Sequence, residues 1–173
     1  NDENLKIEFG CGDKLTKGFV GCDVRSLPNV KYVCKAWEID KFVNDNSVQE
    51  ITSRHFFEHL TFHDGSLTLK TWNKILKNNG VLRICLPDML FHIKQWISPN
   101  RKTNFYPNGT QEELWAIQGF WGKQRETENG EVWDVHKSGY DYELLKDTLE
   151  AHSFRNVRRI HDLPKNLTVE CVK

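Results

Sequence analysis

Apolar residues along the chain fall into short runs, separated by stretches in which they recur every three or four positions. Short apolar runs bounded by turn residues are typical of strands, whereas the wider spacing is typical of amphipathic helices. The runs predict seven strands, at Leu5–Phe9, Phe19–Asp23, Val30–Cys34, Val48–Ser53, Val81–Leu86, Asn156–Ile160 and Leu167–Val172. The wider spacing predicts helices at His55–Leu60, Ser66–Lys77, Met89–Ile97 and Tyr140–His152.

Turn residues mark where these elements end. Asn78-Asn79-Gly80 ends the helix at Ser66–Lys77, and Gly80 suits the left-handed position that often follows a helix. Only Asp162–Asn166 separates the last two strands. A connection this short cannot cross over a sheet, so these two strands should pair antiparallel.

Strands that alternate with helices predict a mostly parallel sheet with helices on both faces. The fold class is therefore α/β: a Rossmann-like, doubly wound sheet of seven strands, mostly parallel, with an antiparallel edge strand at the C-terminus. The chain has 173 residues, the size of one domain with a substantial core. We expect a single domain over residues 1–173.

The periodicity weakens over residues 99–136. This stretch is rich in aromatic side chains, at Phe105, Tyr106, Trp115, Phe120, Trp121 and Trp133. Long irregular segments in compact domains are usually lids or binding loops, which favours an aromatic-rich substrate lid. The alternative is an insertion that packs its own small core.

Composition narrows the function. The 24 Lys and Arg residues balance 24 Asp and Glu residues, and this zero net charge disfavours a protein that grips a nucleic-acid backbone. No apolar run approaches the roughly 18 residues of a membrane span, and no signal-peptide pattern is present. Five cysteines without a C-x-x-C motif indicate reduced, buried thiols and a cytoplasmic protein.

The strand at Leu5–Phe9 runs into the glycine turn Gly10-Cys11-Gly12, and the next strand ends in Asp23. Ligands of open α/β sheets bind beyond the carboxyl ends of the strands. Glycines there allow a ligand to approach the backbone, and an acid can accept hydrogen bonds from two ribose hydroxyls. The pattern predicts a site for an adenosine-type cofactor; an ordinary turn between strand and loop is the alternative.

The spacing argues against a dinucleotide. The third glycine of G-x-G-x-x-G is missing, and Asp23 follows Gly12 by 11 residues, where the dinucleotide pattern expects about 20. Glu8, beside the turn, suits a cationic ligand better than a pyrophosphate. S-adenosylmethionine carries an amino group and a sulfonium but no phosphate, so it is the predicted cofactor.

Taken in order, the motifs resemble those of the class I S-adenosylmethionine-dependent methyltransferases, and more narrowly the small methyltransferase type 11 group. The matching residues are Gly10-Cys11-Gly12, Gly18-Phe19 with Asp23, Asn46-Ser47-Val48 with Ile51, His55-Phe56-Phe57-Glu58-His59-Leu60, Leu76-Lys77-Asn78-Asn79-Gly80 and Leu86-Pro87-Asp88. The resemblance covers residues 5–98 and extends more loosely to the C-terminus.

The resemblance also implies roles. The implied cofactor-binding residues are Glu8, Gly10 and Gly12 at the methionine end, Asp23 at the ribose, Ala36 and Trp37 beside the adenine, and His55 near the sulfonium. Lys35 stands where many members carry an acid for the adenine amino group; backbone groups of Ala36 or Trp37, or the carboxylate of Glu38, are the alternatives. Arg54 replaces a serine, and either serves an anionic substrate or points away.

Methyl transfer to a hydroxyl needs a base, and histidine suits that task near neutral pH. The candidates are His55, His59 and His136, of which the first two are four positions apart and would share a helix face. The alternatives are structural: His59 would bond backbone or Glu58, and His136 would lie at the surface. No metal site is predicted, because His55, His59 and His63 lack the H-E-x-x-H order.

The predicted function is methyl transfer from S-adenosylmethionine to a small polar acceptor, such as a hydroxyl of a sugar or nucleotide-sugar. A nucleic-acid substrate is disfavoured, because Arg54-His55-Phe56-Phe57 stands in place of the [N/D]-P-P-[Y/F] turn of DNA amine methyltransferases. Two alternatives stay open: transfer to nitrogen or to a macromolecule, and a non-catalytic domain that binds the cofactor or acts as a scaffold.

Overall fold

A computed structural model describes residues 4–99, 111–124, 130, 132 and 134–173. Phe105, Tyr106 and Trp133 of the predicted aromatic segment lie outside these residues. The strands are β1 (Leu5–Phe9), β2 (Val20–Asp23), β3 (Val30–Val33), β4 (Val48–Arg54), β5 (Leu76–Pro87), β6 (Arg155–Ile160) and β7 (Asn166–Val172). The α-helices are α1 (Phe62–Ile75), α2 (Met89–Trp96), α3 (Gln111–Trp121) and α4 (Tyr142–Ala151), with 3₁₀ helices η1 (Ala36–Lys41) and η2 (Phe57–His59).

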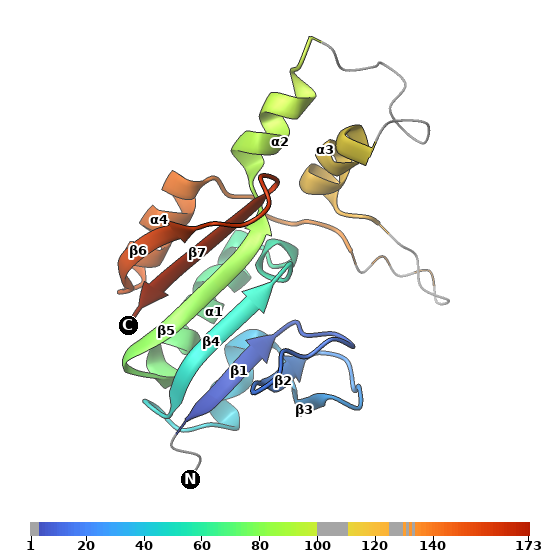
Figure 1. Cartoon of the computed structure of the whole chain (residues 1–173). Helices are drawn as coiled ribbons and strands as arrows, with labels where there is room; N and C mark the ends of the chain where they lie inside the picture. Colours follow the sequence, from blue (N-terminus) through green and yellow to red (C-terminus); the bar gives the residue numbers. More distant parts are fainter. Residues whose placement is uncertain (1–3, 100–110, 125–129, 131, 133) are drawn as a thin grey trace.

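The strands form one seven-stranded sheet in the order β3-β2-β1-β4-β5-β7-β6 (Figure 1). β7 is antiparallel to both of its neighbours, and the other six strands are parallel to one another. This confirms the predicted Rossmann-like, mostly parallel sheet. The strand order reverses between β1 and β4, and the carboxyl ends at such a reversal are where α/β sheets bind ligands.

The sequence predicts that the antiparallel strand lies at the edge of the sheet. In the structure it lies one position inside the edge. After α4 the chain returns as β6, which leaves room for one strand between itself and β5. The short turn after β6 brings β7 back into that space. β6 is therefore the edge strand. Connection length predicted the antiparallel pairing correctly, but it does not say on which side of β6 the last strand lies.

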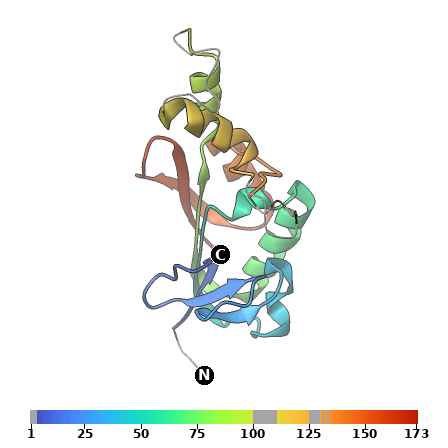
Figure 2. The same ribbon diagram turned by 90° about the vertical axis from the view of Figure 1, so that its right-hand side faces the viewer.

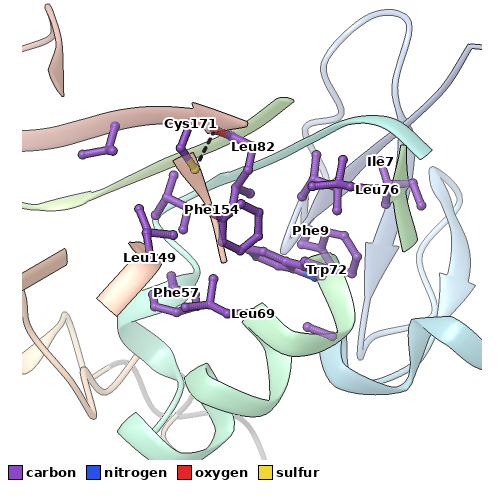
Figure 3. Packing of buried hydrophobic residues seen from close by; sticks show 14 of the residues in the cluster. Ile7, Phe9, Phe57, Leu69, Trp72, Leu76, Leu82, Leu149, Phe154 and Cys171 are labelled. Carbon is purple, nitrogen blue, oxygen red and sulfur yellow. Dashed lines mark hydrogen bonds between the residues drawn. The ribbon is translucent and has the colours of Figure 1, made fainter. Parts of the chain in front are cut away.

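η1, α1 and α4 pack on one face of the sheet (Figure 2). α1 begins at its N-cap Thr61, whose side chain accepts a hydrogen bond from the Asp64 amide. The fully buried Trp72 of α1 packs on Phe9 of β1, with ring centroids 4.7 Å apart, and on Phe57. Figure 3 shows this cluster extending to residues of α4 and β7, so burial of apolar surface holds the helices on this face.

The opposite face carries ion pairs in place of a second helical layer. Lys6 of β1 pairs with Glu50 of β4 at 2.8 Å, and Arg83 of β5 pairs with Glu50 and, at 2.7 Å, with Glu170 of β7. Arg158 of β6 also pairs with Glu170. The expectation of helices on both faces is therefore wrong for the described part of the chain. The connections from β1 to β2 and from β2 to β3 are too short to hold crossover helices.

Two local predictions are also corrected. His55–Leu60 is not an α-helix: His55 has φ 51°, and only Phe57–His59 forms a 3₁₀ turn. His55 cannot continue into a helix because its amide bonds the Cys85 carbonyl at 2.8 Å, as an extension of the sheet. α1 ends at Ile75, and the left-handed residue after it is Asn79, at φ 60°, rather than Gly80.

None of the described helices combines the length and apolarity needed to cross a membrane. All five cysteines are free thiols, and four of them are buried.

Candidate active site

The glycine turn follows β1 at the reversal of strand order. Gly10 and Gly12 have φ 66° and 56°, in the left-handed region that favours glycine. A Cβ on Gly10 would lie 2.4 Å from Cδ2 of Phe56, which follows β4. Glycine is therefore required at position 10 both by the backbone conformation and by the approach of Phe56.

Asp23 lies beneath this turn, at the end of β2. Its Oδ2 accepts a hydrogen bond from the Gly12 amide at 3.0 Å, and its Oδ1 accepts one from the Arg25 amide at 3.0 Å. The Arg25 guanidinium donates to both oxygens at 3.2 Å. Burial opposes ionisation of Asp23, but these hydrogen bonds outweigh burial and lower its pKa.

Four donors fill the lone-pair positions of the Asp23 carboxylate. Ribose hydroxyls can reach it only if the Arg25 side chain, which is 53% exposed, turns away. Glu8 is also engaged, since its Oε2 accepts a hydrogen bond from the Thr16 amide at 2.6 Å and thereby braces the loop after Gly12.

Ala36 and Trp37 begin η1 immediately after β3, at the same edge of the sheet. Ala36 is buried, and the Lys35 ammonium lies 5.4 Å from the centre of the Trp37 indole ring. Glu38 pairs with Lys41 at 2.7 Å. Lys35 therefore stacks on the aromatic ring, and the Glu38 carboxylate that was an alternative adenine contact is paired elsewhere.

Arg54 closes β4 but points away from the glycine turn. Its guanidinium pairs with Asp162, in the turn between β6 and β7, at 3.2 Å. Of the two interpretations of this residue, the structure supports the one in which it is structural.

A cavity of about 630 Å³ lies beyond the carboxyl ends of β4 and β5. It is lined by all three histidines proposed as bases, by Glu58 and Pro87 of the matched motifs, and by residues that the sequence did not single out: His92, Gln118, Gly119, Gly122, Lys123, Asp134, Lys165 and Asn166. Glu8, Gly10, Gly12, Asp23, Ala36 and Trp37 are not in its lining. His55 alone belongs to both predicted sets, and the next residue, Phe56, lies against Gly10 of the glycine turn.

Glu58 lies among the three histidines that line the cavity, His55, His59 and His136, which together form the histidine cluster. Its side chain is 2% exposed, and its Oε1 lies 3.3 Å from Nδ1 of His55 and 3.9 Å from Nε2 of His136. Its Oε2 is buried and has no hydrogen-bond partner among the described residues. Sequence reasoning noticed Glu58 only as a neighbour of the histidines; its position three residues after His55 was the available signal.

His59 and His136 both line the cavity and pack edge to face, with ring centroids 5.0 Å apart. Nδ1 of His59 lies 3.0 Å from the Val135 carbonyl oxygen, and Nδ1 of His136 lies 2.9 Å from the Gly119 carbonyl oxygen. A carbonyl oxygen only accepts, so Nδ1 carries the proton in each ring and Nε2 is left with its lone pair. His136 is 9% exposed, which contradicts the surface alternative, and burial lowers its pKa.

α2 and α3 form one wall of the cavity and stand beyond the end of the sheet (Figure 1). The buried His92 of α2 lies so close to Gly119 of α3 that a Cβ there would be 2.4 Å from its ring. Trp96 packs on Phe120 and Trp121 with ring centroids 5.7 and 5.4 Å apart. The described part of the aromatic segment therefore forms a small packed core and also lines the cavity.

No family model and no curated protein matches the sequence. Solved structures do match in fold. A SAM-dependent methyltransferase from Archaeoglobus fulgidus is 16% identical, with a TM-score of 0.62 over 99% of this chain and 87% of that one. Another, from Methanosarcina mazei, is 14% identical, with a TM-score of 0.58 over 100% and 94%.

A third match is the 1,6-didemethyltoxoflavin-N1-methyltransferase of Burkholderia thailandensis, solved with its substrate and S-adenosylhomocysteine. It is 12% identical, with a TM-score of 0.56 over 98% of this chain and 70% of that one. The strand order, the glycine turn at the end of β1 and these matches agree: the chain has the fold of the class I S-adenosylmethionine-dependent methyltransferases.

Proposed function

We propose that this chain transfers the methyl group of S-adenosylmethionine to a small polar acceptor, such as a sugar or nucleotide-sugar hydroxyl, that binds in the histidine-lined cavity. The carrying observation is that Phe56, which lies against Gly10 of the glycine turn, directly follows His55 of the cavity lining. A cofactor on the turn and an acceptor in the cavity would therefore meet at the end of β4.

The cofactor-binding residues proposed are Glu8, Gly10 and Gly12 for the methionine end, Asp23 for the ribose, Ala36 and Trp37 for the adenine, and His55 near the sulfonium. The residues present fit this ligand. A Cβ on Gly12 would lie 3.1 Å from Nη2 of Arg25, so only glycine leaves that side of the turn open, and the carboxylates of Glu8 and Asp23 attract a cation. The Arg25 guanidinium must move away from Asp23 before the ribose binds, so that hydroxyl groups of the ribose replace the guanidinium as donors to the carboxylate.

Bound S-adenosylmethionine supplies an activated methyl group, so the protein mainly aligns the acceptor and removes its proton. His55, His59 and His136 are the candidate bases. His55 is the best placed, because it precedes Phe56, which lies against Gly10 of the glycine turn, and because its Nδ1 lies 3.3 Å from the buried Glu58 carboxylate. Residues 99–136, including α3, would cover the acceptor as a lid.

The proposal is tested by isothermal titration of the full chain with S-adenosylmethionine. Asp23→Asn is the diagnostic variant, because its amide oxygen can still accept from Gly12 but its charge is gone. We expect saturable binding to the wild type and at least tenfold weaker binding to Asp23→Asn, measured at a temperature where the variant is still folded. Lys17→Ala, at an exposed position in the neighbouring loop, is the control.

A screen of sugars and nucleotide-sugars for S-adenosylhomocysteine release would then identify the acceptor. Turnover on an amine or a macromolecule alone would replace the hydroxyl acceptor with the nitrogen or macromolecular alternative. Binding without turnover on any acceptor would favour a scaffold, and absence of binding by the folded wild type would overturn the proposal.

A further inference from the structure

We infer that Glu58, His59 and His136 bind a divalent transition-metal ion of the zinc type at the cavity. One ligating atom from each of these residues lies within 4.8 Å of the other two. The sequence predicts no metal site, because His55, His59 and His63 lack the H-E-x-x-H order. The third ligand here comes from the segment before α4, which the fold brings onto η2.

The hydrogen bonds of the two histidines prepare them as ligands. Each ring donates its Nδ1 proton to a backbone carbonyl, that of Val135 for His59 and that of Gly119 for His136. This is the outer hydrogen bond that metal-binding histidines usually make, because it fixes the ring and directs the Nε2 lone pair at the ion. Neither ring is free to rotate without losing that bond.

Glu58 supplies the negative charge. Its Oε2 is buried and without a hydrogen-bond partner among the described residues, which costs free energy unless a cation or a donor faces it. His55 can donate to Oε1, but the unprotonated ring nitrogens and the carboxylate oxygens are electron-pair donors. Three such groups, one buried and two half-buried, whose ligating atoms lie close together are stabilised by a cation between them.

The ligand set selects the class of ion. Two imidazoles and one carboxylate are the protein ligands of several catalytic zinc sites, which keep a further coordination position open. Mg²⁺ and Ca²⁺ prefer oxygen ligands throughout and are poorly served by two ring nitrogens. The open position here would face the cavity, so an oxygen of a bound molecule could complete the coordination shell. The site shares His59 and His136 with the proposed methyl transfer, where they are candidate bases, but its test uses no S-adenosylmethionine, so the two proposals can fail separately.

The test starts from the full chain stripped with a chelator and titrated with Zn²⁺, then with Co²⁺, whose visible absorption reports coordination. We expect one Zn²⁺ per chain, a higher unfolding temperature with Zn²⁺, and no competition from Mg²⁺. His136→Gln and His59→Gln should each weaken Zn²⁺ binding by about 100-fold or more. His63→Gln, at an exposed position of α1, should leave Zn²⁺ binding unchanged.

His59 lies in η2 and His136 lies in the segment before α4, so the test remains valid if one of the two variants fails to fold. The inference is overturned if the folded wild type binds neither ion in a stoichiometric manner. It is equally overturned if both ligand variants fold and bind as the wild type does, or if His63→Gln loses binding to the same extent. Loss of S-adenosylmethionine binding would not bear on it, since the two ligands are titrated separately.

Discussion

The Glu58 carboxylate and the His136 imidazole lie with Oε1 and Nε2 3.9 Å apart, although they belong to distant parts of the chain. Their backbones are tied together as well, because the Glu58 carbonyl accepts hydrogen bonds from the amides of Lys137 and Ser138 at 2.8 and 3.2 Å. The segment before α4 is thereby fixed to η2. This relationship builds the histidine cluster on which both proposals about the cavity depend.

Removing the Arg25 side chain should strengthen S-adenosylmethionine binding several-fold. The Arg25 guanidinium occupies both oxygens of Asp23, so it competes with the ribose hydroxyls and also repels a cationic ligand. Isothermal titration of Arg25→Ala against the wild type measures the change. Weaker binding by Arg25→Ala would mean that Arg25 helps to hold the cofactor rather than to block its site.

Gly10→Ala should lower the free energy of unfolding by about 1–3 kcal/mol, because alanine is strained at φ 66° and its Cβ would collide with Phe56. Gly18→Ala is the matched control: it also has a positive φ, 88°, but no heavy atom lies within 4 Å of its Cβ. Urea unfolding compares them. The Gly10→Ala/Phe56→Ala double variant should recover the steric part, and a strictly additive loss would contradict the proposed collision.

Gly119→Ala should loosen α3 from α2, because the new Cβ would lie 2.4 Å from the His92 ring. Hydrogen exchange of the described α3 amides should speed up, while that of β4 and β5 stays as in the wild type. His92→Ala in the same background should restore slow exchange by making room for the methyl group. Unchanged exchange of the α3 amides in Gly119→Ala would show that the two helices accommodate the methyl group without loosening, and would contradict the prediction.

Asp162 should make folding sensitive to acid. Burial opposes its ionisation, but hydrogen bonds from the Thr168 hydroxyl, the Leu163 amide and the Arg54 guanidinium hold the pKa of its carboxyl well below the usual range. A carboxyl whose pKa is lower when folded stabilises the protein above its unfolded pKa, and this contribution is lost as pH falls toward the folded value.

Asp162→Asn should therefore cost about 1.5–3 kcal/mol of unfolding free energy at pH 7. The difference from the wild type should shrink below about pH 4, where the unfolded wild-type carboxyl takes up its proton. Urea unfolding at pH 7, 5 and 3 measures it. Asp45→Asn, at an exposed carboxylate 3.5 Å from Lys74, should have little effect at any of these pH values. A difference that stays constant with pH would mean that charge is not the cause.

The sequence by itself determined the elements whose signal is local. Apolar runs predicted β1 and β4 to within a residue, and the glycine turn at Gly10 was correctly placed after a strand, because strand periodicity and glycine conformation act within a few residues. The mostly parallel direction of the strands followed from the alternation of strands and helices, whereas their order in the sheet was not predicted. The proposed cofactor residues still await a binding measurement.

Tertiary structure alone decided the features that join distant residues. It placed His136 against Glu58, put β7 inside the sheet, and turned His55 into a left-handed residue held by the Cys85 carbonyl. It also paired charges across strands on a face that no helix of the described residues covers, which alternation along any one strand does not reveal. These features depend on packing and hydrogen bonds between segments far apart in the chain, and sequence periodicity carries no information about such contacts.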